Sequence, residues 1–319
     1  MSHNISCTRH IGLLFLLFLM TVFTAGCSKD SPKEENSRKT IENQPLRDSV
    51  PEVLTPESPG EVVFESSCVT IDISNASSGY ITLTYLGNNE KVKFQIVAPD
   101  KITYTYLITN YAEPMVFPLT GGNGNYNLSL LESVDAAKDR YAISLSQEFE
   151  VTLTDEFLPF LTPNVYSYFS SGCDVVLKGE ELAKECYCDL DVIENIYHYV
   201  TGSIVYDEEK ARSVAYGYIP DPNATLTTKK GICFDYASVM TSMLRSQKIP
   251  TKLEVGYAGE VYHAWISCYV DEIGWIDNII EFNGKSWSLM DPTLAANNSR
   301  EAVKEYIGDG SKYLVKYTY

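Results

Sequence analysis

Histidine is scarce in this chain of 319 residues. It occurs four times, at positions 3, 10, 198 and 263. Imidazole is the side chain that ordinarily titrates closest to neutral pH, and it is the most common general acid or base in enzymes. The scarcity therefore limits any histidine-dependent site to very few arrangements.

Positive charge is also in short supply, because 25 Lys and Arg residues face 42 Asp and Glu residues and leave a formal net charge of −17 at pH 7. No run of lysines and arginines forms a basic stripe. Repulsion from phosphate backbones and anionic lipid surfaces excludes the nucleic-acid-binding classes. Hydrophobic residues, at 45%, are sufficient for buried cores, and the length predicts about two domains.

The hydrophobic run near the N-terminus is too short for a permanent membrane helix. Ile11–Phe23 has 13 residues, whereas a span needs about 20. It follows Arg9 and His10 and precedes the small residues 24–26, which is the arrangement of a secretory signal. We therefore predict that residues 1–26 are a signal peptide.

The residue after this segment is Cys27, and the sequence T-A-G-C resembles the lipobox of bacterial lipoprotein signals, with Thr24 where leucine is usual. The resemblance implies that Cys27 is lipidated and attaches the exported protein to the outer face of the cytoplasmic membrane. The alternative is an ordinary signal peptide followed by an incidental cysteine.

Cleavage before Cys27 would remove Arg9 as the one charged residue of the leader, so the net charge would change from −17 to −18. It would also remove His3 and His10. The mature protein would then have His198 and His263 as its imidazoles.

The mature chain divides into three parts. Residues 27–60 are rich in charge and proline, which predicts a disordered tether. Residues 61–157 contain short runs of alternating apolar and polar residues separated by glycine and asparagine turns, and roughly six to eight such strands predict a small β-sandwich. The apolar positions that alternate are Ile81/Leu83/Tyr85, Val92/Phe94/Ile96, Ile102/Tyr104/Tyr106, Tyr126/Leu128/Leu130 and Phe149/Val151/Leu153.

Residues 158–319 begin with helical spacing and end with strand-like runs. Apolar residues recur every three or four positions near 192–200 and again near 237–244, before Pro250. The runs KLEVGYA, VYHAWISCYV, GWIDNIIEF and SWSLMD then predict strands, and Asn283-Gly284 predicts a hairpin between the last two. This part is expected to be an α+β domain.

Cys233 lies in the segment KKGICFDYA, at the predicted start of a helix. The helix N-terminus and the preceding Lys229 and Lys230 favour an anion there, which predicts a lowered thiol pKa and a reactive nucleophile. A thiolate needs a partner to carry protons, and His263 lies in a predicted strand. Asp291, at the end of the next strand-like run but one, could orient that imidazole.

These residues carry a family resemblance. GICFDYAS, HAW and MDPT, with KIPTKLEVGYAG between the first two, resemble the core of the transglutaminase-like superfamily of papain-type cysteine enzymes over about residues 158–300. The resemblance implies a papain-like α+β core with a catalytic Cys233-His263-Asp291 triad that acts on amide carbonyls. The chain departs from the pattern at Ile266, where asparagine is frequent, and in a longer spacing that leaves Asp277 as a rival to Asp291.

The remaining candidates have weaker chemistry. His198 is predicted to be structural. Cys173 could pair with Cys186 or Cys188 in an exported protein. A zinc site is disfavoured because C-x-C is not the usual chelating spacing and little histidine is available, so no metal or cofactor is expected.

The sequence predicts an enzyme that forms a thioester on Cys233 and acts on protein or peptide substrates, cell-wall peptides included. The oxyanion would be bound by the Cys233 backbone N–H and a second donor, for which Tyr206 and Tyr197 are candidates. A surface peptidase or amidase is the favoured interpretation. The alternatives are a crosslinking transglutaminase, and a non-catalytic adhesion protein in which the papain-like domain is an inactive scaffold.

Overall fold

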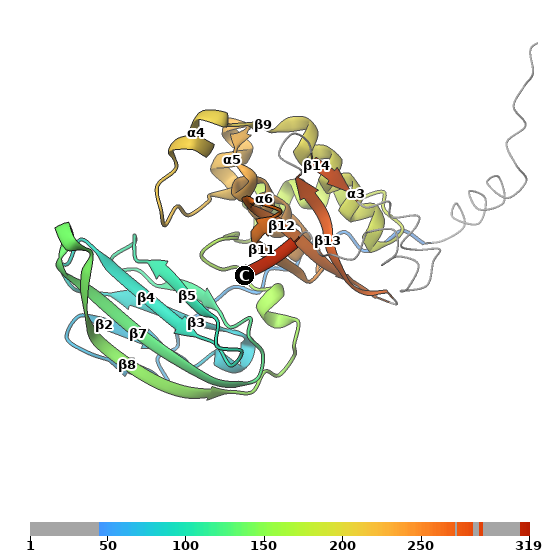
Figure 1. Ribbon diagram of the computed structural model, residues 1–319. Helices are drawn as coiled ribbons and strands as arrows, with labels where there is room; N and C mark the ends of the chain where they lie inside the picture. Colours follow the sequence, from blue (N-terminus) through green and yellow to red (C-terminus); the bar gives the residue numbers. More distant parts are fainter. Residues whose placement is uncertain (1–44, 272, 283–286, 290–312) are drawn as a thin grey trace, which may run out of the picture. The chain divides into compact units, whose positions relative to one another are not determined.

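The computed structural model describes residues 45–271, 273–282, 287–289 and 313–319 (Figure 1). The predicted signal peptide, Cys27, the Asn283-Gly284 turn and Asp291 lie outside the described residues. Within the described residues, no helix combines the length and the apolar character needed to cross a membrane.

The first half of the described chain consists of two antiparallel four-stranded sheets, with the strand orders β1-β2-β3-β6 and β5-β4-β7-β8. The strands are β1 (Val63–Glu65), β2 (Val69–Asp72), β3 (Tyr80–Tyr85), β4 (Val92–Val97), β5 (Thr103–Leu107), β6 (Met115–Pro118), β7 (Gly124–Asp135) and β8 (Arg140–Val151). The five alternating runs recognised in the sequence fall on β3, β4, β5, β7 and β8, except that Ile102 and Leu153 lie just beyond the ends of β5 and β8. The other three strands are short.

Aromatic rings join the two sheets of this β-sandwich. Phe94 of β4 and Phe117 of β6 contact each other edge to face, with 4.9 Å between ring centroids, and Tyr106 of β5 contacts Phe117 at 4.7 Å. Such pairs add to the free energy that burial itself supplies. The alternating apolar residues therefore form the sandwich core, as period-two patterning requires.

The segment 45–60 differs from the disorder predicted for it. The Arg47 guanidinium forms an ion pair with Asp189, and the Arg47 and Glu52 backbone N–H groups donate to the carbonyls of Cys186 and Ser246. The polar composition indicated disorder, but several of these polar groups have specific tertiary partners. This half of the predicted tether is an extended strap on the helical part of the chain.

The second half of the described chain is α+β, as expected (Figure 1). The α-helices are α2 (Asp174–Ala183), α3 (Asp189–Ser203), α4 (Glu208–Ser213), α5 (Pro222–Thr228) and α6 (Cys233–Ser246). The strands are β9 (Val205–Tyr206), β10 (Lys230–Gly231), β11 (Thr251–Ala258), β12 (Val261–Val270), β13 (Gly274–Phe282), β14 (Trp287–Leu289) and β15 (Tyr313–Thr318). Strands β9 and β10 form a parallel pair, and the other five form one antiparallel sheet in the order β14-β13-β12-β11-β15.

Helix α6 is the centre of this domain. It packs against α2, α3 and α5 and against β11 and β12, and every residue from Asp235 to Ser246 is buried. Several residues of this buried stretch are polar, and some of them have hydrogen-bond partners elsewhere in the domain. Ser238, for example, donates to the Tyr166 carbonyl.

Arg245 near the end of α6 is a buried charge, 1% exposed. Its guanidinium donates to the carbonyl oxygens of Thr162, Thr251 and Tyr319 and to the Ser167 hydroxyl, at 2.8 to 3.1 Å. The five contacts connect α6 to β11, to the loop before α2 and to the end of β15.

The described cysteines are all free thiols: Cys68, Cys173, Cys186, Cys188, Cys233 and Cys268. The disulfide considered between Cys173 and Cys186 or Cys188 is not formed. Cys186 is buried instead, donating to the Leu182 carbonyl and accepting from the Asn195 side chain. These hydrogen bonds satisfy the thiol without a covalent partner.

Candidate active site

Cys233 is the first residue of α6, where the sequence predicted it. The turn before it is fixed by Asp235, whose carboxylate accepts from the Ile232 backbone N–H at 2.8 Å. A carboxylate in the first turn satisfies an otherwise unpaired helix N–H and favours the positive end of the helix dipole. The local sequence thus positions the thiol.

A pocket of about 900 Å³ opens beside this helix end, and both Cys233 and His263 line it. His263 lies on β12, which packs against α6. The structure therefore brings together two of the three residues proposed for catalysis. The pocket lining is dominated by aromatic side chains: Tyr166, Tyr206, Tyr216, Tyr218, Phe234, Tyr262, Tyr317 and Tyr319.

His263 is 5% exposed, and this burial lowers its pKa below the usual imidazole range. A hydrogen bond to the Tyr262 backbone acts in the opposite direction but is the smaller effect. The imidazole is therefore neutral at pH 7, which is the form that can accept a proton.

The expected lowering of the Cys233 pKa is wrong for the resting protein. Desolvation raises the pKa of the half-buried thiol, although it accepts hydrogen bonds from the Ala264 and Phe234 backbones. Lys230, expected to supply positive potential, forms an ion pair with Asp207 at 3.2 Å. The sequence motif showed the helix dipole but not the cost of removing water from the thiolate.

Tyr206, at the end of β9, is the tyrosine that reaches Cys233. Its hydroxyl is hydrogen-bonded both to the Cys233 side chain and to the Cys233 backbone N–H, and burial raises its pKa to about 12. The phenol therefore stays protonated at neutral pH. Tyr197 on α3 does not line the pocket.

Two aspartates, Asp291 and Asp277, are candidates for the third member of the proposed triad. Asp277 lies on β13, next to β12, but the register pairs Ile276 with Cys268 and Ile280 with Ile266. Asp277 is thus level with residues about four positions from His263, or about 13 Å along the strand. Strand β14, which precedes Asp291, pairs with β13, so the approach of Asp291 to His263 depends on residues outside the described part.

His198 lies on the exposed side of α3, with 65% of its side chain accessible, and is 3.5 Å from Glu194 one turn earlier. It does not line the pocket. His263 is therefore the histidine available to Cys233.

A buried ion pair beneath the pocket was not recognised in the sequence. The Asp235 carboxylate is 0% exposed and accepts from the Lys210 ammonium at 2.7 Å and from the Tyr218 hydroxyl. Lys210 belongs to α4, and Tyr218 follows the loop that lines the pocket. The network holds one wall of the pocket against the helix that carries Cys233. The D in GICFDYAS was the available signal, but its partners are distant in sequence.

Among the described residues, no group of three histidine, cysteine, aspartate or glutamate side chains could hold a metal ion.

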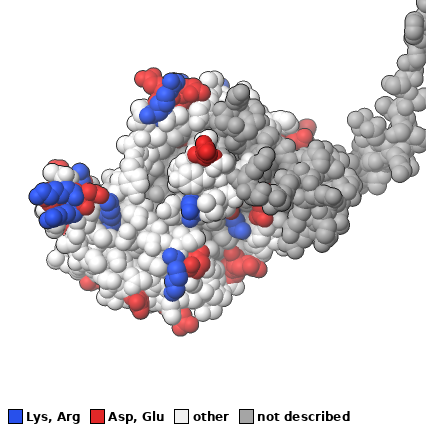
Figure 2. Space-filling model, in the orientation of Figure 1, with Lys and Arg blue, Asp and Glu red and all other residues white. Residues whose placement is uncertain are grey.

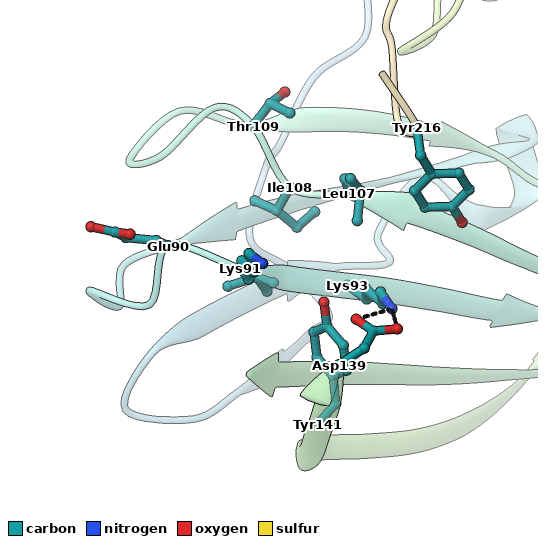
Figure 3. A pocket seen from close by; sticks show the side chains of 10 residues that line it. Glu90, Lys91, Lys93, Leu107, Ile108, Thr109, Asp139, Tyr141 and Tyr216 are labelled. Atoms are coloured by element: carbon teal, nitrogen blue, oxygen red, sulfur yellow. Dashed lines mark hydrogen bonds and ion pairs between the residues drawn. The ribbon is translucent and has the colours of Figure 1, made fainter. Parts of the chain in front are cut away.

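A second pocket, of about 570 Å³, lies on the sandwich (Figure 3). Lys93 points toward Asp139 at 3.3 Å and lies over the Tyr141 ring at 3.9 Å. Tyr216 lines both pockets. The lining of the second pocket has as many acidic as basic side chains. On the face of the molecule drawn in Figure 2, lysine and arginine lie beside acidic residues and do not form a basic stripe.

A cysteine at the start of a buried helix, with a histidine on the antiparallel sheet packed against that helix, is the arrangement of papain-like folds. Residues 179–278 match the sequence model of the transglutaminase-like superfamily. This match, over about a third of the chain, agrees with the family resemblance carried by the motifs, and the α+β fold class is confirmed.

The UPF0252 protein MJ1282 of Methanocaldococcus jannaschii is 32% identical over 91 residues, which are 25% of this chain and 26% of that protein. The match thus spans about a quarter of that relative.

Solved structures to which the chain is similar include a candidate cysteine protease from Cytophaga hutchinsonii, 13% identical, covering 81% of this chain and 73% of that one, with a TM-score of 0.34. The periplasmic domain of TgpA from Pseudomonas aeruginosa, bound to ethylmercury, is 13% identical, with coverages of 67% and 73% and a TM-score of 0.31. Red sea bream transglutaminase is 13% identical, with coverages of 67% and 48% and a TM-score of 0.29.

Proposed function

We propose that this protein is a cysteine enzyme that cleaves peptide or carboxamide bonds through a thioester on Cys233. The observation that carries the proposal is that Cys233 and His263 line one pocket, with the Tyr206 hydroxyl hydrogen-bonded to the cysteine. A nucleophile, a base and a neutral hydrogen-bond donor are the groups that acyl transfer needs.

The reaction begins from a neutral thiol and a neutral imidazole. As the Cys233 sulfur bonds to the substrate carbonyl carbon, His263 takes the thiol proton. The carbonyl oxygen becomes an oxyanion, which the Cys233 N–H and the Tyr206 hydroxyl stabilise once the substrate has displaced their mutual hydrogen bond. His263 then returns the proton to the departing amine.

The thioester that remains is resolved by water, which His263 deprotonates in turn. Hydrolysis requires no second substrate site, so peptidase or amidase activity is the favoured outcome. Attack by a lysine amine, which would make the enzyme a crosslinking transglutaminase, uses the same residues and is the alternative.

Asp291 is proposed to hold the His263 ring in the reactive tautomer. The discriminating experiment compares Asp291→Asn with Asp277→Asn. We expect the first to lower kcat by orders of magnitude and the second to have little effect, because Asp277 follows Ile276, which pairs with Cys268, and is therefore not level with His263. The reverse result would assign the role to Asp277.

Function is tested by incubating the protein with glutamine-containing peptides and a labelled primary amine, followed by mass spectrometry. Cleavage or deamidation without amine adducts supports hydrolysis, and amine adducts support transfer. Cys233→Ala should abolish either, whereas Cys188→Ala, which removes an exposed thiol outside the pocket, should not. Identical products from wild type and Cys233→Ala would favour the non-catalytic adhesion protein.

We further propose that the enzyme is exported and anchored by lipid on Cys27, on the basis of the leader sequence. Its substrates would then be surface proteins or peptides, cell-wall peptides among them. Metabolic labelling with a fatty acid tests this: label should enter wild type but not Cys27→Ala. Label in neither would leave an ordinary signal peptide as the explanation.

A further inference from the structure

The catalytic pocket has an unusual distribution of charge. Among its described lining residues, Glu208 is the only aspartate, glutamate, lysine or arginine. Cys233 and His263 are neutral at pH 7, because burial raises the thiol pKa and lowers the imidazole pKa. The pocket therefore has a single formal negative charge.

Two lysines that lie outside the lining already have carboxylate partners. Lys210 lies 2.7 Å from Asp235, and Lys230 lies 3.2 Å from Asp207. Glu208 is different: its contact with Arg212 is 3.8 Å long, and both side chains are more than 70% exposed. Such a pair contributes little in water, so the Glu208 carboxylate is open to a ligand.

Glu208 lines the same pocket as Cys233 and Tyr206. It follows Tyr206 by two residues in the chain, at the start of α4. Its carboxylate can therefore act on substrate residues that are bound in this pocket next to the reacting bond.

The aromatic residues at the pocket mouth favour the same ligand. Tyr216 and Tyr262 are 73% and 54% exposed. Burial of its hydroxyl raises the Tyr262 pKa to about 12, so this ring carries a neutral phenol at neutral pH. The faces of neutral tyrosine rings attract ammonium and guanidinium groups, and a nearby carboxylate adds to that attraction.

We propose that the pocket selects polypeptides with a lysine or arginine side chain next to the bond attacked by Cys233, and that Glu208 and the mouth tyrosines bind this cation. This inference rests on the proposed function and specifies its substrate class. The net charge of −17 acts in the same direction, because it draws cationic peptides to the protein.

The first arm of the test measures kcat/KM for peptides that differ at one residue beside the reacting bond, where lysine is replaced by norleucine or glutamate. We expect about tenfold preference for lysine over norleucine, and a larger one over glutamate. Added salt should reduce both preferences, because Glu208 is exposed.

The matched variants are Glu208→Gln and Glu209→Gln. Both lie in the first turn of α4, but Glu209 does not line the pocket. Glu208→Gln should remove most of the preference for lysine over norleucine. Glu209→Gln should behave as wild type. If both variants lost the preference for lysine equally, the preference would come from the overall negative charge of the protein and not from Glu208, and the inference would be overturned.

The second arm measures binding without turnover, with the Cys233→Ala protein and the same three peptides. Tighter binding of the lysine peptide, weakened by Glu208→Gln, supports the inference. Equal binding of all three overturns it. Turnover that depends on Cys233 but ignores peptide charge would overturn this inference and leave the proposed function intact, whereas turnover unaffected by Cys233→Ala would overturn the function itself.

Discussion

The Tyr206 hydroxyl is hydrogen-bonded to Cys233 through both the thiol and the backbone N–H. In the proposed mechanism this hydroxyl would be the second donor to an oxyanion formed on a Cys233-bound substrate. It would then exchange its hydrogen bonds with Cys233 for one with the substrate.

Replacement of Tyr206 by phenylalanine should therefore lower kcat by about 100-fold with little change in KM, because the lost donor acts on the transition state. Steady-state kinetics on a chromogenic peptide measure this. Tyr197→Phe, which removes a hydroxyl outside the pocket, serves as the control. An unchanged kcat in Tyr206→Phe would exclude the hydroxyl from oxyanion binding.

The pH dependence follows from the opposite shifts of the two pKa values. Activity needs a neutral His263 and a thiol that still carries its proton. As the pH increases, kcat/KM should therefore rise at a pH below the ordinary imidazole pKa of about 6.5, and it should then stay level into the alkaline range. Iodoacetamide should accordingly alkylate resting Cys233 slowly at pH 6. Alkylation at pH 6 faster than that of a free cysteine peptide would show a preformed thiolate instead.

The same shift of His263 affects stability. Its folded pKa is lowered, so the unfolded state binds the proton more readily, and the free energy of unfolding decreases as the pH falls through the unfolded value toward the folded one. Above the unfolded-state pKa of the imidazole, His263 does not change the free energy of unfolding with pH.

Asp235 and Lys210 form a coupled pair beneath the pocket wall. Asp235→Asn leaves the Lys210 ammonium without its carboxylate and should reduce the free energy of unfolding by about 3 kcal/mol. Adding Lys210→Met to Asp235→Asn should recover part of this loss, because it removes the unpaired charge. Denaturant unfolding of the two single variants and the double variant gives the coupling energy, and simple additivity would contradict the account.

Arg245 connects α6 to three other segments through carbonyl oxygens. Arg245→Met should cost about 3 kcal/mol or more, because it leaves buried acceptors without donors. Arg212→Met, on exposed α4, should stay within about 0.5 kcal/mol of wild type. Urea midpoints of the two variants provide the comparison, and similar midpoints would mean that the Arg245 hydrogen bonds are replaced by others.

Much of the fold could be predicted because it depends on local pattern. The alternation of Val92, Phe94 and Ile96 identifies β4, and the polar turn before Cys233 identifies the start of α6. These signals lie within a few residues of the elements they describe. The strand that carries His263 was likewise predicted from its own residues, the run VYHAWISCYV.

Other features depend on residues that are far apart in sequence. The partners of Arg47 and of Asp235 are supplied by distant elements, so polar composition alone indicated disorder for residues 45–60 and gave no sign of the buried ion pair. The raised pKa of Cys233 has a similar origin. The helix dipole can be inferred from the motif, but desolvation is a property of the assembled pocket.

The central claim is that Cys233 forms the thioester and His263 moves the proton. Rapid-quench mass spectrometry during turnover of a slow ester or amide substrate tests it most directly. We predict an acyl adduct on the peptide that contains Cys233 in wild type, no adduct in Cys233→Ala, and greatly slowed formation in His263→Ala. Turnover that persists in Cys233→Ala, or an adduct confined to another cysteine, would contradict the account.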